Sequence, residues 1–219
     1  MVIKEKRIEK KPLFEQIRAI YSFVKNDIKF GFNDNDNIPA SQVLMDGLGQ
    51  CNTKANLLMA LLRALGIPCR IHFFTIDKNV QKGLLTVLHF MLIPKLLIHS
   101  WVEVLYKKEW IILEGVIIDN EYFSKIKGQI GNFQSFSGYA IACNDLSNLS
   151  LEWNGESTYI QNVLIKDDLG LYKTPDEYYN KYSTNLTGLK KVLFQKHIKP
   201  EMNEMVKKIR NGVYKIKKK

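Results

Sequence analysis

The sequence predicts an α+β fold, because helices come first along the chain, a group of strands follows, and further helices close it. Residues 13–26 repeat apolar side chains at helical spacing, and residues 52–65 are rich in Ala and Leu without Gly or Pro. Strand-like runs then occur at 69–76, 99–106 and 110–116. A chain of 219 residues that is 46% hydrophobic can bury one medium core, which excludes a wholly disordered protein.

The two N-terminal helices have clear boundaries in the sequence. The first, LFEQIRAIYSFVKN, is followed by a polar loop, NDNDN, which lacks the glycine and the later Glu of a calcium-binding EF-hand loop. A short apolar turn, QVLM, and a tight Asp-Gly connection lead to the second helix. Gly66 and Pro68 come directly after that helix and predict its end.

The strands of the first half predict a hairpin. The segments HSWVEVLY and WIILEGV are separated by the Lys-rich turn KKE. Beyond about residue 125 the sequence becomes turn-rich, and TYIQNVLI (158–165) predicts a further strand. The segments PDEYYNKY, LTGLKKVLFQKH and PEMNEMVKKIR predict closing helices. We therefore expect a core over residues 1–125 and a helical C-terminal extension over residues 126–219 that packs on it.

The net charge of +10 is concentrated at the C-terminus, since residues 205–219 carry seven Lys or Arg and no acid. We expect this basic tail to be a solvated end, with weak polyanion contact as the alternative. The chain shows no helix-turn-helix, RNP or aromatic-interleaved basic pattern, so specific nucleic-acid binding is not predicted.

The most apolar stretch, residues 84–98, is shorter than the ~20 residues of a membrane-spanning helix and contains Pro94 and Lys95. No membrane span is predicted. We expect a buried core or groove segment, with a membrane-surface patch as the alternative. The cysteines are few and odd in number, and the N-terminus has no apolar signal region, so a cytoplasmic protein with free thiols is expected.

Cys51 lies immediately before the second helix, after a glycine-containing turn. Free backbone N–H groups and the helix dipole favour a thiolate there and can stabilise an oxyanion beside the sulfur. Lys54 would add positive potential if it pointed the same way. A buried structural cysteine is the alternative, and it is the expected role of Cys69 and Cys143.

A nucleophilic cysteine needs a histidine base. His99 opens a strand that alternates in polarity, whereas His72 and His89 lie within apolar runs and His197 lies in a late basic helix, where we expect it to be exposed. His99 is therefore the candidate base.

The hairpin register selects an acid to orient His99. If Lys107-Lys108 is a two-residue turn, Glu114 lies on the same sheet face as His99 and diagonal to it, about 7–8 Å away. Asp119 has the opposite parity and lies past the expected strand end, so it is the alternative acid. A solvent-facing carboxylate is the other interpretation of Glu114.

Three ordered segments resemble the transglutaminase-like superfamily. GLGQCNTKANLLMALLRALGIPCR resembles the family's cysteine-bearing helix, HSWVEVLYKKEWIILEG resembles its histidine and acid strands, and PASQVLMDG resembles the segment before the cysteine. The sequence departs from the family at three places: Glu114 replaces the usual Asp, Gly115-Val116 replaces Pro-Thr, and Asn52 replaces the aromatic residue of the animal cross-linking enzymes.

The resemblance implies a papain-like catalytic core over residues 1–125, with the cysteine helix packed on an antiparallel sheet. It also implies that Cys51 is the nucleophile, His99 the base and acid, and Glu114 the orienting acid. The expected activity is acyl transfer on peptide or protein amides through a thioester, with hydrolysis favoured over transamidation. No cofactor is expected, and the cysteine spacing does not fit a zinc site. The alternative function is a catalytically inactive protein-interaction module.

Overall fold

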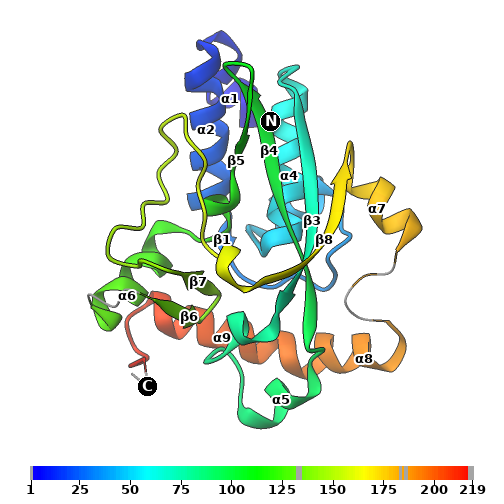
Figure 1. The fold of residues 1–219 in the computed structure, drawn as a ribbon, viewed down its shortest axis with the longest axis vertical. Coiled ribbons are helices and arrows are strands. Elements are labelled where there is room, and N and C mark those ends of the chain that lie inside the picture. The colour runs from blue at the N-terminus through cyan, green and yellow to red at the C-terminus, as the bar shows by residue number, and fades with distance from the viewer. Residues whose placement is uncertain (1, 132–134, 183, 185–186, 217–219) are drawn as a thin grey trace.

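The computed structural model describes residues 2–131, 135–182, 184 and 187–216. The fold is the expected α+β arrangement, in which helices pack against an antiparallel sheet (Figure 1). The helices described are α1 (Val2–Glu5), α2 (Leu13–Asn26), α3 (Ala40–Asp46), α4 (Cys51–Ala64), α5 (Val87–Leu92), α6 (Asn120–Ile130), α7 (Pro175–Lys181), α8 (Gly188–Leu193) and α9 (Lys199–Arg210). The strands described are β1 (Lys29–Phe30), β2 (Leu48–Gly49), β3 (Cys69–Asp77), β4 (Leu96–Tyr106), β5 (Glu109–Ile112), β6 (Phe136–Gly138), β7 (Ile141–Cys143) and β8 (Ile165–Tyr172).

The main sheet has the order β5-β4-β3-β8, and all neighbouring strands in it are antiparallel. Helix α4 packs against β3 and β4, and α2 lies against α4 (Figure 1). The cysteine-bearing helix therefore lies on the sheet, as the sequence predicted. Strand β8 comes from the C-terminal half and pairs with β3, so both halves of the chain contribute to this sheet.

The hairpin between β4 and β5 has the predicted register, with Tyr106 opposite Glu109 and Glu103 opposite Ile112. Lys107 and Lys108 both have positive φ angles, 51° and 69°, as a tight two-residue hairpin turn requires. The prediction that the second strand continues to residue 116 is wrong. Strand β5 ends at Ile112, and residues Glu114–Ile117 form a 3₁₀ turn, η3.

Gly115 is at the centre of η3, where the chain passes close to a buried tyrosine. A Cβ atom on Gly115 would lie 2.6 Å from the Tyr21 hydroxyl and 3.0 Å from Thr158. Because such an approach excludes any larger side chain, the glycine allows the turn to pack tightly against α2.

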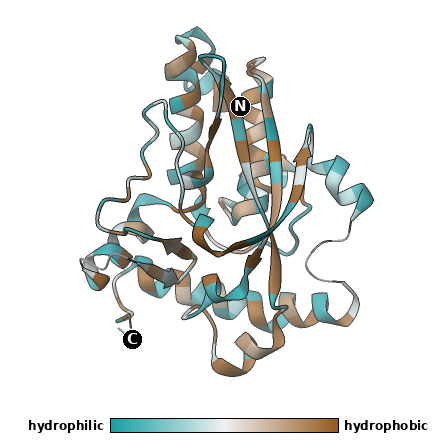
Figure 2. Ribbon diagram, in the orientation of Figure 1, coloured by the Kyte–Doolittle hydropathy of each residue, from teal (hydrophilic) through white to brown (hydrophobic). Residues whose placement is uncertain are grey.

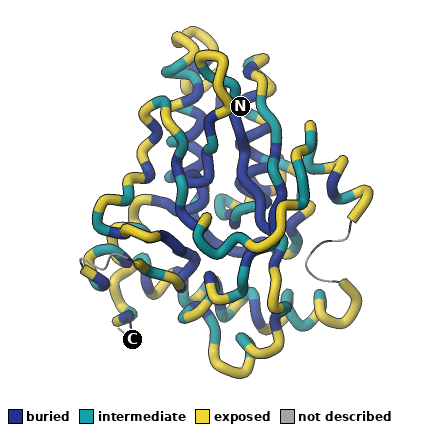
Figure 3. Tube along the Cα trace, viewed as in Figure 1, coloured by how far each residue is buried: buried dark blue, intermediate teal, exposed yellow. Residues whose placement is uncertain are grey.

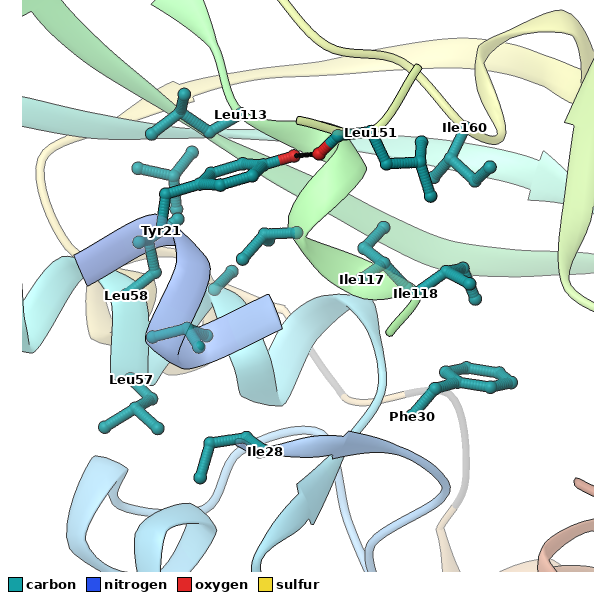
Figure 4. Packing of buried hydrophobic residues seen from close by; sticks show 14 of the residues in the cluster. Tyr21, Ile28, Phe30, Leu57, Leu58, Leu113, Ile117, Ile118, Leu151 and Ile160 are labelled. Carbon is teal, nitrogen blue, oxygen red and sulfur yellow. Dashed lines mark hydrogen bonds between the residues drawn. The ribbon is translucent and has the colours of Figure 1, made fainter. Parts of the chain in front are cut away.

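The core lies between α2, α4 and the η3 turn (Figure 4). Helix α2 has the predicted bounds, and its Ile17, Ile20 and Val24 are fully buried. The Tyr21 hydroxyl donates to the carbonyl oxygen of Leu151 at 2.8 Å, which satisfies a polar group in this apolar region. This bond joins the chain at Leu151 to helix α2.

Two other sequence predictions are corrected by the structure. Residues 158–165 do not form a strand: Asn162–Leu164 form a 3₁₀ turn, η4, and the strand is β8. The segment 84–98 is not wholly buried, because α5 exposes several large apolar side chains at one end of the molecule (Figure 3).

The C-terminal basic segment is only in part a solvated end. Residues up to Arg210 complete α9, and Val206 and Ile209 of that helix are buried. Arg210 donates to the buried carboxylate of Asp119 at 2.8 Å. Residues 217–219 lie outside the described residues.

Candidate active site

Cys51 is the first residue of α4, and its side chain is half-buried. The residue before it, Gln50, caps the helix, and its backbone N–H donates to the Thr53 hydroxyl at 3.0 Å. The first N–H groups of a helix have no intrahelical acceptor and carry the positive end of the dipole. The Cys51 side chain therefore lies beside these N–H groups.

The polar loop at residues 33–37 supports this helix start. The Gln50 side-chain oxygen accepts the Asn33 N–H at 2.9 Å, and its Nε2 donates to Asp36 at 3.1 Å. The Thr53 hydroxyl donates to the Asn33 side-chain oxygen at 2.7 Å. Sequence reasoning treated NDNDN only as a connection, because nothing local shows that a loop near residue 35 will contact residue 50.

His99 lies on β4 and is fully buried. Its Nε2 lies 2.9 Å from Oε1 of Glu114, which is also fully buried. The other ring nitrogen, Nδ1, has no hydrogen-bond partner among the described residues. It is thus the nitrogen available to the Cys51 thiol.

The side chain of Asn52 ties the start of α4 to the strand that carries His99. Its Nδ2 donates to the Ile98 carbonyl oxygen at 3.1 Å, and its Oδ1 accepts the Ser100 hydroxyl at 2.8 Å. Ile98 and Ser100 are the two sequence neighbours of His99. Asn52, which stands where the animal cross-linking enzymes have an aromatic residue, therefore helps to fix the cysteine helix relative to His99.

Glu114 reaches His99 from η3 and not from a strand. Its second oxygen accepts the Ile160 N–H at 2.9 Å. The backbone of the turn is held by the same segment, since the Glu114 N–H donates to the Thr158 carbonyl at 3.2 Å and the Gly115 N–H donates to the Thr158 hydroxyl at 3.1 Å. The carboxylate is thus fixed at both oxygens, which excludes the interpretation of a solvent-facing side chain.

The surroundings of His99 favour its charged form. Burial alone would lower the pKa of His99, but its interactions with Cys51 and Glu114 outweigh burial and raise the pKa to about 10. The ring is then an imidazolium near neutral pH, with Nε2–H donated to Glu114. Burial raises the pKa of Cys69, and raises that of Cys143 to about 11, so both remain thiols.

The other histidines lie away from this pair. His72 lies between Glu103 and Asp168, at 3.2 and 2.9 Å from its two ring nitrogens. His89 contacts Glu201, and His197 is exposed as predicted. Within the described ranges, no cluster of three or more His, Cys, Asp or Glu residues is arranged to hold a metal ion.

Asp119, the alternative acid, makes a different set of contacts. It is fully buried, accepts the N–H groups of Phe30 at 2.8 Å and Tyr122 at 3.0 Å, and pairs with Arg210. Burial would raise the pKa of Asp119, but these bonds, led by Arg210, hold it below its usual value. Asp119 therefore connects α6 and α9 to the strand at Phe30.

Lys54 does not point toward the thiol. It is fully buried, and its Nζ donates at 3.0 Å to the carbonyl oxygens of Lys25 and Ile117. Burial lowers the pKa of Lys54 to about 7, although Asp119 opposes the shift. Because Ile117 belongs to η3, this lysine joins the cysteine helix to the turn that carries Glu114.

A partly open pocket with a cavity volume of about 90 Å³ contains Cys51 and His99 on its wall. Its apolar side is formed mainly by Phe30, Phe32, Ile76, Val80, Ile93, Pro94, Leu97 and Phe194. Asp34 and Asp36 lie on its polar side, and the described lining includes no Lys or Arg.

The fold is that of the papain-like class, with a cysteine at the start of a helix that packs on an antiparallel sheet. The sequence profile of the transglutaminase-like superfamily matches residues 3–115, just over half of the chain. The chain therefore belongs to the transglutaminase-like superfamily, which places it at family level among the papain-like thiol enzymes.

A comparison with curated proteins gave no match. Among solved structures, the chain is similar to a putative cysteine protease from Cytophaga hutchinsonii, with 15% identity and a TM-score of 0.43. The similarity covers 79% of this chain and 41% of that protein, so the chain spans less than half of its length. Among the helices of the described residues, none has the length and apolarity that crossing a bilayer requires.

Proposed function

We propose that the protein catalyses thiol-dependent acyl transfer on peptide or protein amides, with Cys51, His99 and Glu114 as its triad. The Cys51 thiolate attacks the amide carbonyl carbon, and the N–H groups of the first turn of α4 stabilise the oxyanion. The imidazolium of His99 gives its Nδ1 proton to the departing amine nitrogen as the C–N bond breaks. The products of this half-reaction are a free amine and a Cys51 thioester, with His99 neutral.

Hydrolysis completes the cycle. Neutral His99 takes a proton at Nδ1 from water as the oxygen attacks the thioester carbon, and the C–S bond breaks to return the thiolate. The carboxylic acid leaves, and His99 is again an imidazolium. We favour water over an amine acceptor because the Cys51 side chain is half-exposed, so solvent reaches the thioester.

The unpartnered Nδ1 of His99 carries this proposal. Buried polar atoms in native proteins are almost always hydrogen-bonded, and leaving one without a partner costs about 1–3 kcal/mol. Here one nitrogen is fixed by a buried carboxylate, while the other makes no hydrogen bond to the described residues and has the Cys51 thiol as its interacting group. A histidine with a purely structural role has no reason to retain this arrangement, whereas a base that moves a proton to and from sulfur requires it.

The pocket suggests the kind of amide. Its apolar side fits a bulky aliphatic or aromatic side chain next to the scissile bond, and its acidic side does not favour a carboxylate there.

We also propose a cytoplasmic setting, since all three cysteines are free thiols.

The test is turnover of a defined peptide mixture in ¹⁸O-labelled water, followed by mass spectrometry. We expect cleaved peptides with ¹⁸O in the new carboxylate for the wild-type protein and none for Cys51→Ala or His99→Ala. A biotinylated primary amine added in parallel detects transamidation as an alternative product. Absence of both products, with a folded protein, would support the inactive interaction module instead.

A further inference from the structure

Helix α5 presents an apolar face to solvent. Val87, Leu88, Met91 and Leu92 are 77%, 62%, 64% and 51% exposed, and their spacing places them on neighbouring positions of the helix surface. Leu96, just beyond the helix, is 42% exposed. Single exposed apolar residues are common, but a contiguous group of this size indicates a binding surface.

This helix is held firmly at the end of the molecule. It forms the lowest point of the view in Figure 1 and is strongly coloured for hydrophobicity in Figure 2. The Thr86 N–H and His89 both bond to Glu201 of α9, and Lys78 Nζ donates to the Phe90 carbonyl at 2.8 Å. Helix α5 is therefore fixed in place, because polar groups of its segment are hydrogen-bonded to Glu201 and Lys78.

The chain segment around the helix is basic. From Lys78 to Ile98 the sequence contains three lysines and no acid, and Lys82 and Lys95, which precede and follow the helix in the sequence, are exposed. The acidic side chain of Glu201 also contacts the helix, where it is bonded to Thr86 and His89. Helix α8 lies at the same end of the molecule in Figure 1 and repeats the pattern, with Leu189 88% exposed next to the exposed Lys190.

We propose that α5 and its flanking lysines bind an anionic lipid membrane surface, with the apolar face inserted among the lipid chains. Apolar residues beside lysines are the combination that interfacial helices use on anionic lipids. A second copy of the chain fits poorly, because both copies would bring the same lysines and a net charge of +10 to the contact. A convex tip of aliphatic side chains also suits insertion better than it suits capture of a peptide.

Membrane binding would place the candidate active site close to the lipid surface. Ile93, Pro94 and Leu97, which directly follow the exposed face of α5, line the pocket that contains Cys51. The binding surface itself uses other side chains, so it can be tested without altering the pocket.

The test is flotation of the full chain with vesicles of phosphatidylcholine alone or of phosphatidylcholine with 30% phosphatidylglycerol. We expect binding to the anionic vesicles, little binding to the neutral ones, and release in 0.5 M NaCl because salt screens the lysines. Leu88→Ser/Met91→Ser should lower the partition coefficient at least about tenfold, since two inserted side chains are lost. Lys82→Glu/Lys95→Glu should lower it on anionic vesicles only.

The matched control is Met45→Ser/Val213→Ser, which removes two side chains that are 73% and 75% exposed elsewhere on the surface. This variant should bind like wild type. Absence of binding, equal binding to neutral and anionic vesicles, or an equal loss in the control would overturn the proposal. Sedimentation velocity addresses the competing occupant: a wild-type dimer that Leu88→Ser/Met91→Ser dissociates would assign the surface to self-association instead.

Discussion

Replacing Glu114 by Gln tests the triad with the least change of shape. The two carboxylate oxygens accept separate donors, His99 Nε2–H and the Ile160 N–H. A glutamine has one oxygen, so its NH₂ group must face one of these donors. Either the histidine loses its acceptor, or the Ile160 N–H does.

The size of the effect follows from these contacts. A hydrogen bond to a charged group contributes about 1.5–3 kcal/mol, and an unsatisfied buried donor adds about 1–3 kcal/mol. If about 2–4 kcal/mol of the lost hydrogen-bond energy raises the activation free energy, kcat/KM falls roughly 30- to 1,000-fold, at 1.36 kcal/mol per tenfold. The native fold should persist, because the side-chain volume is unchanged.

The pH profile separates loss of charge from general damage. In the wild type, the raised pKa of His99, about 10, keeps the imidazolium through neutral pH, so the alkaline limb of activity lies high. In Glu114→Gln the burial of His99 is no longer opposed by a carboxylate, so this limb should move to lower pH by more than one unit.

The assay is kcat/KM for a cleaved peptide across pH 5–10, with the rate of Cys51 alkylation as a readout independent of turnover. Circular dichroism and urea unfolding control for folding. A decrease below threefold with an unchanged alkaline limb would refute the role of Glu114. Loss of activity in Asp119→Asn while Glu114→Gln stays active would transfer that role to Asp119.

Three further predictions concern the same region. Limiting iodoacetamide near pH 6.5 should alkylate Cys51 before the two other cysteines, and His99→Ala should slow this alkylation at least tenfold. Site-resolved mass spectrometry measures both rates. Equal labelling of all three thiols would contradict a reactive Cys51. Asp119→Asn should lower the free energy of unfolding by about 2–4 kcal/mol, because the charge-assisted bonds of Asp119 to Arg210 and to two backbone N–H groups are weakened. The alkaline limb of the activity profile should stay in place. A shifted limb would contradict a purely structural role for Asp119. Burial lowers the pKa of Lys54 from 10.5 to about 7, so between these pH values the unfolded chain binds more protons than the folded one, and Lys54 makes the free energy of unfolding rise with pH. The difference in this free energy between wild type and Lys54→Met, measured by urea unfolding at pH 7, 8 and 9, should change in favour of wild type by up to about 1.4 kcal/mol per pH unit. A constant difference would show that Lys54 stays charged.

The sequence predicted best those features that depend on local patterns. The apolar spacing of residues 13–26 and the composition of residues 52–65 determined two helices, and the Lys107-Lys108 turn set the hairpin register. The match of the superfamily profile agrees with the resemblance that the cysteine and histidine segments suggested.

The features that sequence reasoning missed depend on contacts between distant parts of the chain. Glu114 leaves the strand because residues 158–160 bind the turn, and neither segment alone indicates that pairing. The burial of Lys54 against the carbonyls of α2 and η3 reverses its expected role, since a lysine on a helix normally extends into solvent. The exposure of α5 was only the alternative to the expected buried segment, because an apolar run does not reveal whether a partner element covers it.

The proposed mechanism requires that Cys51 forms an acyl-enzyme with the help of His99. The direct measurement is intact mass spectrometry of the protein, acid-quenched milliseconds after mixing with an activated peptide ester. We expect a transient mass increase equal to the acyl group, localised to Cys51, released by hydroxylamine, and formed much more slowly by His99→Ala. A stable, unmodified mass in the wild type, or an adduct that forms equally fast in His99→Ala, would contradict it.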